Sequence, residues 1–145
     1  MTNFARIRDL ARQEERLRWA VQRQEAKCTK ITPTYSNMPK GGGGNQRREE
    51  DMIRLVLVKE QHGAVKAELD TERESLGRYT RRLKDGTWRA AMEYRYMKNM
   101  RITEIGEAMG YSERQVFRIL QRAEAQVIQW QKAKEAKKKD GSTCH

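Results

Sequence analysis

The sequence predicts an all-α protein: an N-terminal helix, a long heptad-bearing helix of coiled-coil type and a C-terminal helix-turn-helix domain. Three observations support this. Of the 145 residues only 37% are hydrophobic while 35% are charged, a composition typical of solvated helices with narrow apolar stripes. Apolar residues recur at helical spacing in separate segments, and Gly, Pro and Asp-Gly breaks divide these segments from one another. A single large core is therefore not expected.

The first element is an amphipathic helix within residues 1–28. Its apolar residues lie three and four positions apart with charged residues between them: Phe4, Ile7, Leu10, Ala11, Leu17, Ala20 and Val21. Residues 29–46 contain Pro33, Pro39 and four consecutive glycines, which favour a flexible linker. Lys40 precedes these glycines instead of following them before Ser or Thr, so a phosphate-binding loop is not predicted.

A long helix is predicted over residues 47–84. Its heptad seam places one set of residues every seven positions and a second set three positions later: Leu55, His62, Leu69, Leu76 and Leu83, then Val58, Val65, Glu72 and Tyr79. Such a seam packs along another helix, which is either that of a second copy or the segment Asn3 to Lys27 folded back across the linker. We favour a homodimer. His62 and Glu72 are expected to set register at the seam rather than perform chemistry.

Residues 85–130 predict a helix-turn-helix domain, since Asp85-Gly86 breaks the long helix and aromatic residues become more frequent. Its helices are expected at Thr87–Lys98, at Ile102–Met109 and from Ser112 to about Gln129. Gly110 suits the left-handed end of the second helix, and Ser112 with Gln115 suits a capping box at the start of the third. The Lys-rich residues 131–145 are expected to form a disordered tail.

The third helix of this domain has two different faces at about 100 degrees per residue. One face is apolar and is expected to pack: Val116, Ile119, Leu120, Ala123 and Val127. The other carries Arg114, Arg118 and Arg122 with glutamines beside them, the residue types that pair with guanine and adenine edges in the major groove of DNA. We predict base reading by Glu113, Arg114, Gln115 and Arg118, and phosphate contacts by Lys98, Arg101, Ser112 and Arg122. The alternative is a solvated face of helix-supporting ion pairs.

Charge and the chemistry-bearing residues point to binding and not to catalysis. The net charge of +11 favours a polyanionic partner, which we take to be double-stranded DNA. Cys28 and Cys144 form no CxxC pair and only two histidines accompany them, so neither a metal site nor an enzyme nor a cofactor is expected. No signal peptide or membrane-spanning run is apparent, so we expect no membrane partner and a cytoplasmic, nucleoid-associated protein.

Residues 94–96, 105–112 and 116–119 resemble the fourth region of bacterial sigma factors. The chain from about Leu17 to Gln129, including the Ser36–Gly42 connector, is similar to phage late-transcription regulators of the RinA and ArpU type. The resemblance implies activation of phage late genes, including packaging genes, together with the host RNA polymerase.

Two positions depart from the pattern of this family. Arg101 replaces the usual Ser or Thr cap of the short second helix, and Gly106 replaces the usual Ala, which predicts a loss of about 1 kcal/mol in that helix. The short helix is therefore expected to be weakly stable.

Two other functions compete with a transcription regulator. A small terminase subunit also joins a helix-turn-helix to an oligomerising helical region, but recognises packaging sites on phage DNA. A structural coiled-coil adaptor would not bind DNA at all.

Overall fold

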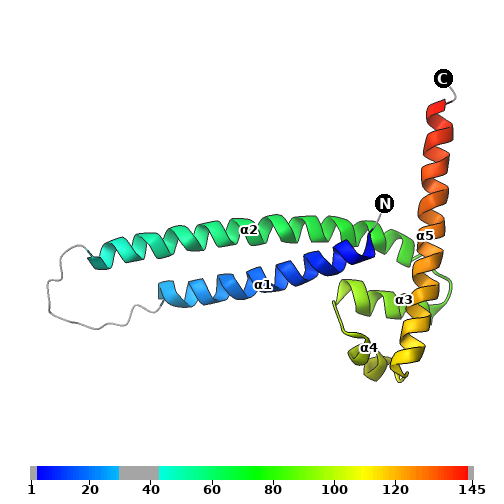
Figure 1. The fold of residues 1–145 in the computed structure, drawn as a ribbon, viewed down its shortest axis with the longest axis horizontal. Helices are drawn as coiled ribbons and strands as arrows, with labels where there is room; N and C mark the ends of the chain where they lie inside the picture. The colour runs from blue at the N-terminus through cyan, green and yellow to red at the C-terminus, as the bar shows by residue number, and fades with distance from the viewer. Residues whose placement is uncertain (1–2, 30–42, 144–145) are drawn as a thin grey trace. The chain divides into compact units, whose positions relative to one another are not determined.

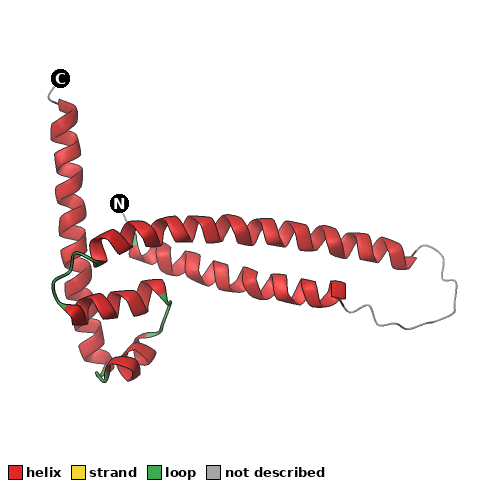
Figure 2. Ribbon diagram, turned by 180° about the vertical axis from the view of Figure 1, so that it is seen from behind, coloured by secondary structure: helices red, strands yellow, loops and turns green. Residues whose placement is uncertain are grey.

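The computed structural model describes residues 3–29 and 43–143, and every regular element in these ranges is a helix (Figures 1 and 2). The helices are α1 (Phe4–Thr29), α2 (Gly43–Thr80), α3 (Gly86–Met92), the π-helical η1 (Glu93–Met97), α4 (Ile102–Met109) and α5 (Glu113–Thr143). The all-α prediction is confirmed. Most of the predicted linker, including both prolines, lies outside the described residues.

The chain divides into two units, which we describe separately. Unit 1 comprises Met1–Arg8 and Asp70–His145, and unit 2 comprises Asp9–Leu69. Unit 1 holds all of residues 85–130, for which the sequence predicts a helix-turn-helix domain. Within the described ranges, no helix is both long enough and apolar enough to cross a membrane.

Unit 2 is an antiparallel hairpin of α1 and α2. The Gln24 side-chain amide donates to the main-chain carbonyl of Asp51 at 3.0 Å, and His62 Nε2 lies 3.1 Å from Glu14 Oε1. Apolar side chains of both helices are buried: Leu10 and Ala11 from α1, Leu55 and Leu69 from α2. In unit 2 the heptad seam therefore faces α1 of the same chain, which is the folded-back alternative; the homodimer remains a prediction.

Unit 1 is built around the end of α2, α3, η1, α4 and α5. Its core is a set of side chains from all of these elements: Leu76, Leu83, Ala91, Met92, Tyr96, Ile105, Val116, Leu120, Ala123 and Val127. Asp85 starts α3 as its N-cap, because its carboxylate accepts from the Thr87 amide at 2.9 Å. The first turn of α1 joins this unit through Phe4, whose ring centroid lies 5.2 Å from that of Tyr96.

One helix of the domain is longer than the sequence predicted. The third helix was expected to end at about Gln129 and to be followed by a disordered tail, but α5 continues to Thr143. Ala, Lys and Glu, which dominate residues 132–139, all have high helix propensity. Contacts within unit 1 hold the stretch just before them, since the Arg82 guanidinium lies 4.5 Å from the Trp130 ring and Gln131 is buried.

Candidate nucleic-acid interface

The helix-turn-helix is formed by α4, the turn at residues 110–112 and the start of α5. Ile105 of α4 and Val116 and Leu120 of α5 are buried together in the core of unit 1. Gly110 ends α4 with φ 74° and ψ 31°, the left-handed conformation predicted for it. The bounds predicted for the second helix, Ile102–Met109, are also confirmed.

Gly106 is a requirement of the turn and not a weak point of α4. The Tyr111 amide donates to the Gly106 carbonyl at 2.9 Å, which draws the turn onto this position. A Cβ atom at Gly106 would lie only 2.6 Å from the main-chain oxygen of Tyr111. Helix propensity does not predict this requirement, because it depends on the helix alone and not on the backbone that packs against it.

The start of α5 is closed by the predicted capping box. The Gln115 amide donates to Ser112 Oγ at 3.2 Å, and the Ser112 amide donates to Gln115 Oε1 at 3.0 Å. These bonds satisfy free amides at the helix end, and they fix the direction in which α5 leaves the turn.

Replacing Ser112 with alanine is expected to lower the free energy of unfolding by about 1 kcal/mol, the usual value of such a cap. Thermal unfolding followed by circular dichroism measures the change. Ser142→Ala is the matched control, because it makes the same replacement close to the far end of α5. Equal stability of the two variants would show that the box is not formed in solution.

The N-terminus of α4 lacks a side-chain cap, as the sequence predicted. Arg101 is the N-cap residue with φ −73° and ψ 155°, and its side chain makes no capping bond. Instead, the Thr103 hydroxyl in the first turn of α4 donates to Glu113 Oε1 at 2.9 Å. This bond links the two helices of the motif.

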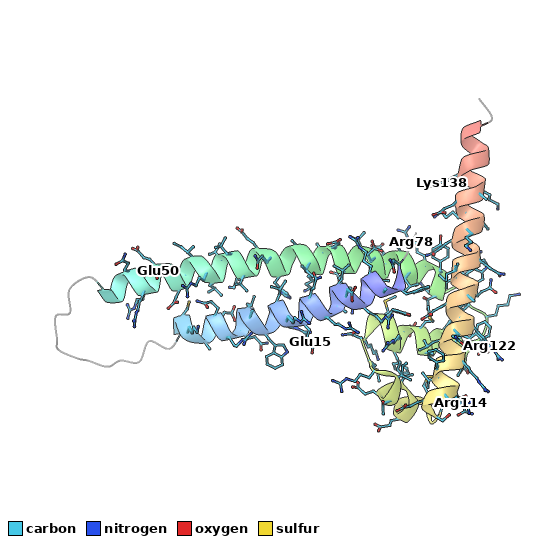
Figure 3. All side chains as sticks on the ribbon, in the orientation of Figure 1. Glu15, Glu50, Arg78, Arg114, Arg122 and Lys138 are labelled. Atoms are coloured by element: carbon cyan, nitrogen blue, oxygen red, sulfur yellow. The ribbon has the colours of Figure 1, made fainter. Side chains whose placement is uncertain are left out.

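The basic face of α5 is exposed. Arg114, Arg118 and Arg122 all lie in solvent, and no ion pair of residues 3–29 and 43–143 engages them. Arg114 and Arg122 project from α5 in Figure 3. The opposite face of the helix is buried in the core, so these guanidinium groups are presented outward by a fixed element.

Two predicted reading residues have partners inside the motif. Glu113 accepts from Thr103, and Gln115 Oε1 is held by Ser112. Reading a base with either side chain would replace these bonds. The phosphate contact predicted for Ser112 likewise competes with the cap, whereas Arg114 and Arg118 need no such exchange.

Phe117 is an exposed residue of this surface that sequence reasoning missed. Its side chain is 52% exposed. At about 100 degrees per residue it lies between the buried face and the arginines. The helical spacing alone was sufficient to predict that Phe117 lies outside the packed face. An apolar side chain at this position can contact the methyl group of thymine.

Lys98 and Arg101, the other predicted phosphate ligands, flank a distorted segment before α4. The expected continuous helix Thr87–Lys98 ends in η1, where the Lys98 amide donates to the Glu93 carbonyl five residues earlier at 3.1 Å. Asn99 follows with φ 53°. Lys98 is exposed, with Nζ 5.2 Å from the Tyr94 ring centroid, and Arg101 is exposed beside Glu104.

Tyr96 secures this segment to the core. The Arg73 guanidinium donates to its carbonyl at 2.9 Å, and its hydroxyl donates to Glu124 of α5. Burial, together with the bond to Glu124, raises the pKa of the Tyr96 hydroxyl, so it remains a neutral donor throughout the physiological range.

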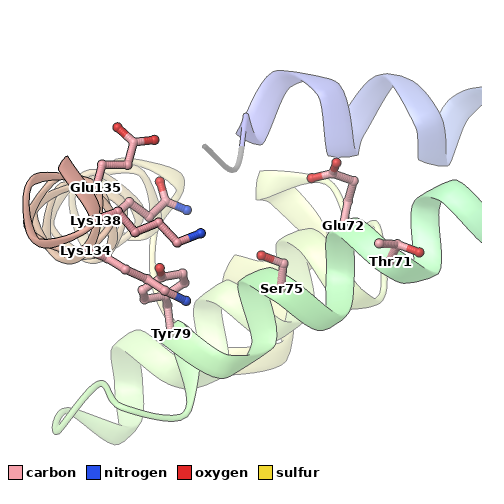
Figure 4. Close-up of a pocket in the computed structure, with 8 residues that line it drawn as sticks. Thr71, Glu72, Ser75, Tyr79, Lys134, Glu135 and Lys138 are labelled. Carbon is pink, nitrogen blue, oxygen red and sulfur yellow. The ribbon is translucent and has the colours of Figure 1, made fainter. Parts of the chain in front are cut away.

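A cavity of about 350 Å³ lies in unit 1 between the end of α2 and α5 (Figure 4). Its lining combines hydroxyl, ammonium and carboxylate groups: Thr71, Glu72, Ser75, Tyr79, Gln131, Lys134, Glu135 and Lys138. Gln131 is only 4% exposed, and neither its amide nitrogen nor its oxygen has a hydrogen-bond partner within residues 3–29 and 43–143. A buried amide without partners is destabilising.

Gln131→Leu is therefore expected to raise the free energy of unfolding by about 1 kcal/mol, because it removes two unsatisfied polar atoms and keeps the side-chain volume. Chemical denaturation measures the change. The exposed Gln129→Leu serves as control and is expected to change stability by less than about 0.5 kcal/mol. A clear loss of stability in Gln131→Leu would mean that the amide has partners in solution.

Comparison with known proteins identifies one family. Residues 31–127 match the family model described as a protein of unknown function (DUF1492), which is more than half of the chain. No curated protein and no solved structure matches the chain. The described residues contain no group of three or more His, Cys, Asp or Glu side chains that could hold a metal ion.

Proposed function

We propose that this chain, which belongs to the family described as a protein of unknown function (DUF1492), is a sequence-specific double-stranded DNA-binding transcription regulator. The observation that carries the proposal is the exposed row Arg114, Arg118 and Arg122 on a helix whose other face is buried. A sharp turn and a capping box precede this row. Together these features give a rigid basic helix that fits a major groove.

In the proposed complex the N-terminal part of α5 enters the major groove of B-DNA. Arg114 and Arg118 each pair with a guanine edge, a contact worth about 1 to 3 kcal/mol of discrimination. Arg122, Lys98 and Arg101 contact phosphates and set the orientation of the helix. Glu113 and Gln115 contribute to reading only where DNA displaces their internal partners.

The resemblance to phage late-transcription regulators and to the fourth region of sigma factors supports an activator of late genes. Such a protein would dock near a promoter in the bacterial host and contact the host RNA polymerase. The proposal includes association of two or more copies, because one reading helix covers only a few base pairs.

The second candidate is a small terminase subunit, which would use the same helix to recognise packaging sites on phage DNA. The number of copies separates the two functions. A closed ring of about eight or more copies would contradict the activator, whereas a dimer or another small assembly would favour it. Sequencing of the fragments bound from the parent genome, compared with late promoters and packaging sites, gives an independent answer.

Arg118→Ala and Lys98→Ala form a pair that tests the binding mode. Arg118→Ala is expected to relax the base preference at one position, because it removes a base contact, while Lys98→Ala is expected to weaken all duplexes about equally. Binding to a panel of singly substituted duplexes measures both effects. If Arg118→Ala weakened every duplex by the same factor, Arg118 would be a phosphate ligand.

A further inference from the structure

The outer side of α2 in unit 2 carries an apolar stripe that α1 does not cover. Three neighbouring large side chains are more than half exposed: Ile53 at 59%, Val56 at 52% and Leu57 at 54%. At about 100 degrees per residue they lie on the side of α2 opposite Leu55 and Leu69, which are buried. The helix is thus apolar on two sides. Exposed apolar clusters on soluble proteins mark interaction surfaces.

Acidic residues lie beside this stripe, and the exposed Arg54 is at its border. Glu49, Glu50 and Glu60 are exposed and share its side of the helix, within about 120 degrees. We call this set the α2 outer face: Glu49, Glu50, Ile53, Val56, Leu57 and Glu60. Glu50 is labelled in Figure 3, on the side of α2 away from α1.

The outer side of α1 has the opposite charge and its own apolar residue. Trp19 is 59% exposed, although indole rings are usually covered. Arg12, Arg16 and Arg23 are exposed and lie within about 60 degrees of it around the helix. We call the set Arg12, Arg16, Trp19 and Arg23 the α1 outer face. Two exposed acidic residues border this set: Asp9, whose carboxylate lies 3.7 Å from the Arg12 guanidinium, and Glu15, which Figure 3 shows on the side of α1 away from α2.

The two outer faces are level with each other along the hairpin. Glu14 contacts His62 and Gln24 contacts Asp51, which fixes the register of the two helices. Trp19 is midway between Glu14 and Gln24, so it is level with Leu57, which lies near the midpoint between Asp51 and His62.

The charges follow the same register. Arg16 lies about one turn from Trp19 and is level with Glu60. Arg23 lies about one turn from Trp19 in the other direction. It is level with the turn of α2 that contains Ile53, beside Glu49 and Glu50. If a second hairpin lies alongside the first and points in the same direction, Trp19 of one copy therefore contacts the apolar stripe of the other copy. The arginines of its α1 outer face then lie beside the glutamates of the neighbouring α2 outer face.

We propose that copies of this chain associate side by side, the α1 outer face of one copy packing on the α2 outer face of the next. This inference goes beyond the proposed function and does not depend on DNA. Complementary charge selects a second copy as the occupant, since the acidic and apolar face of α2 meets a basic and aromatic face of matching position. In this contact, α1 of one copy pairs antiparallel with α2 of the next copy, as α1 and α2 do within unit 2 of a single copy.

The interface is heterologous, because its two halves lie on opposite sides of one hairpin. Two copies joined in this way leave one face exposed at each end, so association continues beyond the dimer into a ring or a row. This distinguishes it from a twofold dimer, in which one surface would contact itself.

Complementation between two variants tests the proposal. Trp19→Ser damages only the α1 outer face, and Val56→Ser/Leu57→Ser damages only the α2 outer face; these side chains are exposed, so the fold is expected to persist. In sedimentation velocity on the full chain without DNA, the unmodified protein is expected to exceed two copies as concentration rises. Each variant alone is expected to associate at least about tenfold more weakly. Their mixture is expected to form a one-to-one complex and stop there.

Charge reversal gives a second route that keeps the apolar residues. Arg16→Glu and Glu60→Arg are each expected to weaken association about tenfold, and the double variant is expected to restore it. The control is Phe117→Ser, which alters an equally exposed apolar residue in unit 1 and is expected to leave association unchanged.

The proposal is overturned if the unmodified protein remains a monomer or stops at a dimer, if Trp19→Ser alone associates normally, or if the mixture stays monomeric. A closed ring of about eight or more copies built through this interface would support it and contradict the activator function, so the two proposals fail separately.

Discussion

Gly106→Ala is expected to destabilise the helix-turn-helix by about 2 to 3 kcal/mol. The added methyl group would lie 2.6 Å from the Tyr111 carbonyl oxygen, a main-chain atom that cannot move without opening the turn. Overpacking of this kind costs about 1 to 3 kcal/mol, and the bond from the Tyr111 amide to Gly106 would be strained as well. In the interior of an ordinary helix the same replacement would have the opposite effect, because alanine stabilises a helix relative to glycine. Urea denaturation followed by circular dichroism measures the free energy of unfolding.

Gly63→Ala is the matched control within the same chain. Gly63 lies in the interior of α2, and a Cβ atom there would meet nothing within 4 Å. Alanine at this position is expected to stabilise the protein by up to about 1 kcal/mol. The two variants should therefore shift stability in opposite directions. A Gly106→Ala protein as stable as the unmodified chain would show that the turn does not approach α4 as described.

Simultaneous replacement of Arg114, Arg118 and Arg122 with alanine is expected to weaken binding to specific duplex DNA by about 100-fold or more. Even at about 1 kcal/mol for each lost contact, the sum is about 3 kcal/mol, which corresponds to that factor. The fold should be unaffected, because all three side chains are exposed and alanine favours a helix. Fluorescence anisotropy with a labelled duplex measures affinity, and the circular dichroism spectrum checks the fold.

A second triple variant that loses the same number of positive charges distinguishes local contacts with DNA from the effect of the net charge of the protein. Arg47, Arg54 and Arg78 are exposed on α2, and their replacement with alanine also removes three positive charges. This control is expected to reduce affinity only slightly, since the three charges are removed from α2 and not from the basic face of α5. If both triple variants lost the same affinity for DNA, binding would depend on the net charge of the protein and not on the basic face of α5.

Local signals in the sequence located the motif well. The bounds of α4, the left-handed Gly110 and the Ser112–Gln115 box were all predicted, because each depends on residues only a few positions apart. Four of the five residues assigned to the packed face of α5 are buried, and Ile119 is half-buried. Helical spacing is sufficient to find such a face.

Features that depend on contacts distant in sequence were missed. The requirement for Gly106 comes from the Tyr111 carbonyl, and the bond from Thr103 to Glu113 joins two different helices. Helix propensity describes neither. The π-helical turn after α3 was also not predicted; there Arg73, 23 residues away in the sequence, donates to the Tyr96 carbonyl.

The seam of α2 shows a different limit of sequence reasoning. Its heptads correctly indicated a helical partner, but a heptad pattern does not say whether that partner is α1 or a second copy. The choice in unit 2 depends on pairings such as Glu14 with His62, which become visible only once the hairpin is formed. The second apolar stripe, at Ile53, Val56 and Leu57, was not predicted, because these residues lie outside the heptad seam.

The basic face of α5 is proposed to bind duplex DNA through both phosphates and bases. A binding titration of the full chain at rising salt tests it most directly, using a duplex selected from the parent genome and a scrambled duplex of equal length. The logarithm of the affinity is expected to fall linearly with the logarithm of salt concentration, with a slope of about −3 or steeper for three phosphate contacts. The selected duplex should bind more tightly at every salt concentration. An affinity that does not weaken with salt, or that is equal for the two duplexes, would contradict sequence-specific binding of DNA by this face.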